Sequence, residues 1–201
     1  NSSDIVQRNF PVFSSGIGIF RILKNWEFSF ATMLTGRSPG IEDLYSDGPH
    51  LGTYAYEIGQ PTLGLEQTIG IEASLEHKTD KSEIRMTGYQ NYSPNYHISA
   101  KMGECEEPFL NFEDSHPCAG ADFIAWGKGS SGWLYKYQMS EIRSSIYGVE
   151  SEFKVNLTKM INIFGNISLT RGDNLSDKTS LAYMPPDKLL FATELDLNPA
   201  S

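Results

Sequence analysis

Residues 149–170 read VESEFKVNLTKMINIFGNISLT, and this stretch decides the fold class. Apolar and polar residues alternate in it with a period of two, which is typical of a β-strand with one apolar and one polar face. The pattern breaks once, at Thr158-Lys159, where a short turn would join two such strands. The apolar positions on either side of the turn are Val149, Phe153, Val155 and Leu157, and then Ile161, Ile163, Gly165, Ile167 and Leu169.

The same alternation recurs along the chain, for example at Trp26, Phe28 and Phe30. Several of the patterned stretches exceed the usual strand length of about five or six residues, and are long enough to cross a bilayer at a tilt. The pattern predicts strands at about 9–23, 26–37, 65–77, 83–99, 132–157, 161–171 and 180–197.

The connections between these strands alternate in length. Short turns are expected at 24–25, 78–82 and 158–159, long loops at about 38–64 and 100–131, and a connection of medium length near 172–179. Bacterial outer-membrane barrels have tight turns at the periplasmic end and long loops outside the cell. The sorting therefore favours an all-β fold, an antiparallel transmembrane β-barrel, over a soluble β-sandwich.

The predicted strands are too few for a closed barrel of their own. Such barrels have an even number of strands, about eight or more, and unpaired backbone groups are not tolerated in lipid. We therefore expect a partial barrel. The absence of an initiator methionine and of a targeting signal at Asn1-Ser2-Ser3 suggests a processed chain or a fragment.

Composition excludes some classes of function. The net charge of -9 and the isoelectric point near 4.9 argue against nucleic acid as a partner. No apolar run approaches the roughly 18 residues of a membrane-spanning helix. The sequence has neither a Gly-x-Ser-x-Gly elbow nor a phosphate-binding glycine loop, so an enzyme is not predicted.

The only two cysteines, Cys105 and Cys118, lie within one polar stretch. Their proximity suits a small disulfide in an oxidising compartment. Two free thiols are an alternative, and so is a zinc site formed with His116, although no C-x-x-C pair is present.

Residues 34–53, LTGRSPGIEDLYSDGPHLGT, carry a family resemblance. They resemble TonB-dependent receptors, which share an Arg-x-Pro box, a Glu-Leu-Tyr-like turn and a Gly-Pro-His loop. Residues 56–66, YEIGQPTLGLE, are similar to the way that family begins its next strand. Two further similarities follow in the same order, at Tyr147–Glu150 and at Leu181–Pro186.

The resemblance implies a receptor in the bacterial outer membrane that imports a metal or a metal complex, such as an iron siderophore, haem or zinc. Its barrel would have about twenty-two strands around an N-terminal plug, which lies outside this sequence. Energy would come from the TonB–ExbB–ExbD complex through that plug. The other expected partners are outer-membrane lipid, lipopolysaccharide and the ligand, with no tightly bound cofactor.

His50 is the residue to which the resemblance draws attention, because haem receptors carry an axial-ligand histidine between two such boxes. The Gly-Pro-His form also resembles receptors for zinc and other iron complexes, in which carboxylates could join the histidine. Alternatively, this segment is a turn that only shapes the loop. The candidate ligand-binding residues are Arg37, His50, Tyr54 and Glu57, and the candidate metal ligands are His50, Asp47, Glu57 and His116.

The second long loop is acidic around the two cysteines and could gather metal ions, or could simply be solvated. Two other functions stay open at this point. One is a passive porin-like or adhesin barrel that binds ligands through its loops. The other is a soluble β-sandwich that binds or cleaves carbohydrate. Such a protein would be a monomer that stays folded without detergent and, if catalytic, would have two carboxylates about 5–10 Å apart in a cleft.

Overall fold

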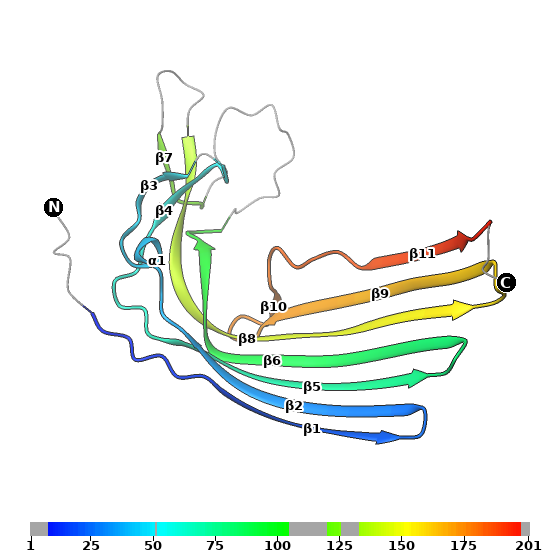
Figure 1. The fold of residues 1–201 in the computed structure, drawn as a ribbon. Helices are drawn as coiled ribbons and strands as arrows, with labels where there is room; N and C mark the ends of the chain where they lie inside the picture. Colours follow the sequence, from blue (N-terminus) through cyan, green and yellow to red (C-terminus); the bar gives the residue numbers. More distant parts are fainter. Residues whose placement is uncertain (1–7, 51, 105–119, 126–132, 198–201) are drawn as a thin grey trace. The chain divides into compact units, whose positions relative to one another are not determined.

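The computed structural model describes residues 8–50, 52–104, 120–125 and 133–197, and this part of the chain is almost entirely antiparallel β-sheet (Figure 1). It contains one short helix and eleven strands, seven of which are long. The elements are β1 (Ser15–Leu23), β2 (Trp26–Arg37), α1 (Ile41–Tyr45), β3 (Asp47–His50), β4 (Ala55–Ile58), β5 (Glu66–Lys78), β6 (Ser82–Lys101), β7 (Phe123–Ala125), β8 (Trp133–Asn156), β9 (Ile161–Asn174), β10 (Thr179–Ser180) and β11 (Lys188–Leu195).

The chain forms two compact units, which we describe separately. The sheet unit comprises residues 13–36, 67–94 and 143–201, and the loop unit comprises residues 1–12, 37–66 and 95–142, each within the described ranges. The long strands of the sheet unit are neighbours in the order β1-β2-β5-β6-β8-β9-β11. Its edge strands are β1, which pairs with β2, and β11, which pairs with β9.

The short turns of the sheet unit lie side by side at one end. The backbone N–H of Lys78 donates to the carbonyl of Asn25 at 2.8 Å, that of Asn156 to Lys81 at 2.8 Å, and that of Asp196 to Met160 at 2.8 Å. These bonds connect the β1–β2, β5–β6 and β8–β9 turns in series. The turns at 24–25, 79–81 and 157–160 therefore lie at the same end of the strands, as the connection lengths predict.

The strand register separates an apolar face from a polar one. Leu75 lies opposite Met86 and Val149 opposite Leu169, whereas Glu76 lies opposite Arg85 on the other face. Arg85 on that polar face contacts Glu76 at 2.9 Å and Glu152 at 3.7 Å. The apolar face carries Ile17, Ile19, Phe28, Phe30, Ile69, Ile71, Leu75, Met86, Val149, Phe153, Ile163, Ile167, Leu169, Leu189 and Phe191.

This apolar face is not covered by a second layer of the described chain. Ile17 is 71% exposed and Phe191 is 65% exposed. The buried hydrophobic residues all belong to the loop unit instead, and they are Leu44, Ala55, Leu63, Ala121, Leu134 and Ile142. The sheet unit thus leaves uncovered the surface that a soluble sheet protein would bury.

The fold class predicted from the alternation is confirmed, and each predicted strand corresponds to a long strand of the sheet. Two boundaries were wrong. The first strand begins at Ser15 rather than near residue 9, after Pro11, which has no N–H for the ladder. The last predicted strand, 180–197, is interrupted at Pro185-Pro186, so that β10 ends at Ser180 and β11 starts at Lys188.

The loop at 38–64 contains regular structure that the alternation does not reveal. It forms α1 and the antiparallel β3–β4 hairpin, and β4 in turn pairs in parallel with β8. Asp43 Oδ2 accepts the backbone N–H of Gly40 at 2.9 Å and so caps the start of α1. The backbone N–H of Gly59 donates to the carbonyl of Ser46 at 2.7 Å, which fixes the hairpin base against the end of the helix.

Candidate functional site

The β3–β4 hairpin places His50 and Glu57 on the same face. Gly48 pairs with Glu57, and His50 with Ala55, so the two side chains are diagonal neighbours across the two strands. His50 Nδ1 lies 2.7 Å from Glu57 Oε1. Gly48 leaves open space beside Glu57, since a Cβ at position 48 would meet nothing within 4 Å.

This contact determines which nitrogen of His50 is free to bind a ligand. A carboxylate only accepts hydrogen bonds, so Nδ1 is the donor to Glu57, and Nε2 keeps its lone pair in the tautomer that this contact selects. The same carboxylate–histidine arrangement orients histidines that bind metals. The His50 side chain is 57% exposed, so Nε2 is accessible from outside the hairpin.

Asp47 lies on the opposite face of the hairpin, where it accepts a hydrogen bond from Tyr56 Oη at 2.9 Å. This bond raises the pKa of the Tyr56 hydroxyl above its ordinary value. Asp47 therefore does not converge with His50 and Glu57. Within the described ranges, no three histidine, cysteine or acidic side chains are grouped so as to hold a metal ion.

In the described part of the chain, two further candidates form no hydrogen bond or ion pair with His50 or Glu57. Tyr54 occupies the hairpin turn with a positive φ of 53° and is exposed. Arg37 binds Glu66, with Nε 3.3 Å from Oε1 and Nη2 2.9 Å from Oε2. Cys105, Cys118 and His116 fall outside the described residues.

Glu66 is the centre of a buried polar cluster in the loop unit that sequence reasoning did not find. It is 8% exposed, and besides Arg37 it accepts the backbone N–H of His97 at 2.9 Å. Burial disfavours the charged form of Glu66, but the hydrogen bonds from Arg37 and from the His97 backbone outweigh this effect. The pKa of Glu66 is therefore lowered.

His97 is enclosed in this cluster, with a side chain that is 0% exposed. Nδ1 lies 3.9 Å from Glu66 Oε2, and Nε2 lies 3.7 Å from Glu141 Oε1. Both distances exceed hydrogen-bond length, and neither ring nitrogen has a partner among the described residues. Glu66 lies beyond Nδ1 and Glu141 lies beyond Nε2, on opposite sides of the imidazole ring. A single metal ion therefore could not bind both carboxylates and the imidazole at the same time.

Glu141 also accepts the backbone N–H of Gly64, and Arg37 lies 3.9 Å from Asp43 in α1. The Glu66 cluster thus connects both ends of the 38–64 loop to the long strands.

No helix within the described ranges is long and apolar enough to cross a membrane.

Comparison with known proteins identifies the fold. No protein-family model matches the sequence. Among solved structures, the chain is similar to the copper transporter OprC, with a TM-score of 0.64 and 15% identity over 92% of this chain and 24% of that one. It is also similar to the siderophore receptor PirA from Acinetobacter baumannii, with a TM-score of 0.58 and 11% identity over 92% of this chain and 26% of that one.

The siderophore receptor PirA from Pseudomonas aeruginosa gives a TM-score of 0.55 and 15% identity over 80% of this chain and 28% of that one. The chain thus spans about a quarter of the length of the receptors it matches. At such identities the likeness concerns the fold alone. The described sheet thus shares its fold with one part of the solved copper transporter and siderophore receptors.

Proposed function

We propose that this chain is part of an outer-membrane receptor that takes up a metal ion or metal complex, and that His50 contacts the metal. The observation that carries the proposal is the His50–Glu57 pair, in which the carboxylate orients the imidazole and leaves Nε2 exposed. The exposed apolar face of the sheet unit supports a place in the bilayer.

The opposite face of the sheet suits the interior of a barrel. It carries charged pairs such as Arg85 with Glu76, and strands of transmembrane barrels alternate apolar residues toward lipid with polar residues toward the lumen. Outer-membrane barrels have short turns at the periplasmic end and long loops outside the cell, so the 38–64 loop that carries His50 would face an arriving ligand. The energy would come from the TonB–ExbB–ExbD complex.

A single exposed imidazole provides one coordination position. It suits a borderline metal such as copper or zinc, or an iron complex that has an open site. The similar proteins are named as a copper transporter and as siderophore receptors, which supports cargo of this class. Other ligands would have to come from the chelate or from parts of the receptor outside the described residues.

Metal binding to the full-length receptor tests the role of His50. The receptor would be purified from outer membranes and titrated with Cu²⁺ and Zn²⁺, and its metal content measured by mass spectrometry. His50→Ala is expected to abolish binding at this site. Glu57→Gln is expected to weaken it by about 10–100-fold, because the imidazole loses the group that orients it.

Asp47→Asn is the matched control, because it removes a carboxylate from the same hairpin but from the other face. It is expected to leave metal binding unchanged. Equal binding by wild type and His50→Ala would contradict the proposal and make the Gly48-Pro49-His50 segment a loop-shaping turn. The proposal would also be contradicted if Asp47→Asn lost metal binding while His50→Ala kept it.

A further inference from the structure

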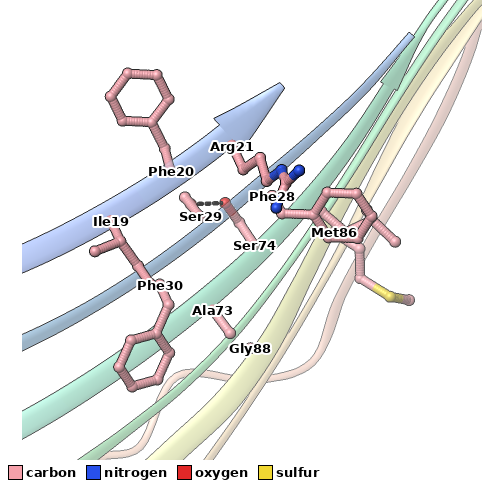
Figure 2. A pocket seen from close by; sticks show the side chains of 11 residues that line it. Ile19, Phe20, Arg21, Phe28, Ser29, Phe30, Ala73, Ser74, Met86 and Gly88 are labelled. Atoms are coloured by element: carbon pink, nitrogen blue, oxygen red, sulfur yellow. Dashed lines mark hydrogen bonds between the residues drawn. The ribbon is translucent and has the colours of Figure 1, made fainter. Parts of the chain in front are cut away.

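The apolar face of the sheet unit has a gap where two small residues are paired. Ala73 on β5 lies directly opposite Gly88 on β6, whereas the next pair toward the turn is Leu75 with Met86. With Phe30 beside it on β2, the gap forms an open depression of about 590 Å³ (Figure 2). A Cβ at Gly88 would meet nothing within 4 Å, so the space above it is empty of protein.

A second depression, of about 180 Å³, continues the first. Both are lined by Phe30, Ala73 and Gly88, and the second extends to Ile71 and Gln90. The two depressions therefore form one groove, which follows the direction of β5 and β6. An elongated, apolar and open groove of this kind fits a hydrocarbon chain better than a compact polar solute.

Arg21 lines the groove near the short-turn end of the sheet unit. It pairs with Phe28 in the β1–β2 register, and Figure 2 shows its guanidinium beside the Phe28 ring. Two residues of β1 separate it from the turn at Lys24. No hydrogen bond or ion pair joins the Arg21 side chain to another residue in the described ranges, whereas Arg85 and Arg171 both contact carboxylates.

An unpaired cation on a lipid-facing surface is unfavourable in the hydrocarbon region, and long cationic side chains near strand ends extend to the headgroup layer. The fork of a guanidinium matches the oxygens of a phosphate. Arg21 thus supplies a charge complementary to a lipid headgroup, next to a groove of a shape that suits an acyl chain.

We propose that this face binds one phospholipid, with its phosphate at Arg21 and one acyl chain in the groove over Ala73 and Gly88. The inference rests on the proposed function, because it requires the sheet unit to lie in the outer membrane. A phospholipid is specified because Arg21 is at the short-turn end, which faces the periplasm in such barrels. Lipopolysaccharide occupies the other leaflet.

Native mass spectrometry of the full-length receptor in detergent, with phosphatidylglycerol or lipopolysaccharide added, tests the site. Wild type is expected to retain one phosphatidylglycerol. Arg21→Gln should reduce its retention about tenfold, the effect of losing one charge-assisted contact. Gly88→Leu should reduce retention as well, because the new side chain enters the groove from a position where its Cβ meets no protein atom within 4 Å.

Lys81→Gln is the matched control, since it removes an exposed cation from another short turn at the same end. It is expected to retain the lipid. Equal retention in Arg21→Gln and wild type, or retention of lipopolysaccharide in place of phosphatidylglycerol, would overturn the proposal. Metal binding measured in the same samples separates the two ideas: a receptor that binds metal through His50 but retains no lipid refutes only the lipid site.

Discussion

Gly59→Ala is expected to detach the β3–β4 hairpin from α1 and to lower the local stability of the 38–64 loop by about 3 kcal/mol. A Cβ at position 59 would lie 2.5 Å from the carbonyl carbon of Leu44, 2.5 Å from the amide nitrogen of Tyr45 and 2.7 Å from the carbonyl oxygen of Leu44. All three atoms belong to the backbone of α1, so no side chain can rotate away to relieve the overlap.

The substitution would also break two backbone hydrogen bonds next to the overlap. The N–H of Gly59 donates to Ser46, and the N–H of Gln60 donates to Asp43 at 2.8 Å. Once the helix is displaced, both donors must find water, and each lost bond is worth about 1 kcal/mol. Metal binding at His50 should weaken in parallel, because the hairpin that aligns His50 with Glu57 loses its base.

Hydrogen exchange measured by mass spectrometry on the full-length receptor would report this opening directly. Amides of residues 41–60 should exchange faster in Gly59→Ala, while those of β8 and β9 keep their protection. Gly48→Ala is the control, since it adds the same methyl group to the same hairpin at a position with no neighbour within 4 Å. Unchanged protection in Gly59→Ala would show that α1 does not pack against residue 59.

Glu66→Gln is expected to destabilise the loop unit by about 2 kcal/mol at neutral pH. The replacement keeps the size of the side chain but removes the charge that receives Arg37 and the backbone N–H of His97. The gain from Arg37 alone is moderate, because its side chain is 55% exposed and solvent screens the pair. The larger effect comes from the His97 N–H, which stays buried and loses a charged acceptor.

The lowered pKa of Glu66 adds a pH dependence with a definite sign. Its ionised form is favoured in the folded state, so the stability it contributes is fully present above the unfolded pKa of about 4.3. That contribution is lost as the pH falls through the lower, folded-state pKa. Wild type should therefore lose more stability than Glu66→Gln on acidification, and the two should converge at the lowest pH.

Urea denaturation of the full-length receptor at a series of pH values from neutral to below the pKa of glutamate measures both effects. Glu42→Gln serves as the control, because Glu42 lies at the exposed first turn of α1. It should shift neither the midpoint nor the pH profile. If the free energy of unfolding of Glu66→Gln matched that of wild type at every pH, the Glu66 cluster would have no stabilising role.

The long strands could be predicted because their environment imposes a regular pattern. Val149 to Leu169 alternate between two surfaces of opposite polarity, and the register shows that the apolar members share one face. The loop contents could not be predicted in the same way. The strands β3 and β4 have four residues each, and one of them contains Gly48 and Pro49, which are rare in strands.

The arrangement of the candidate site residues was predictable only in part. His50 and Glu57 were both candidates, but Asp47 was grouped with them because its sequence position is close to that of His50. The hairpin register separates Asp47 from the other two residues, since it places residues 48, 50, 55 and 57 on one face and Asp47 on the other. Glu66, His97 and Glu141 come from three different strands, so only the tertiary arrangement brings them together.

The two edges of the sheet unit have a practical consequence for anyone who produces this chain by recombinant expression. Within the described residues, β1 and β11 each have a neighbour on one side, and their outer backbone groups are free to pair. Such edges are templates for strand addition, and the exposed apolar face favours the same outcome. Expressed alone in the cytosol, the chain should accumulate as inclusion bodies with amyloid-like order.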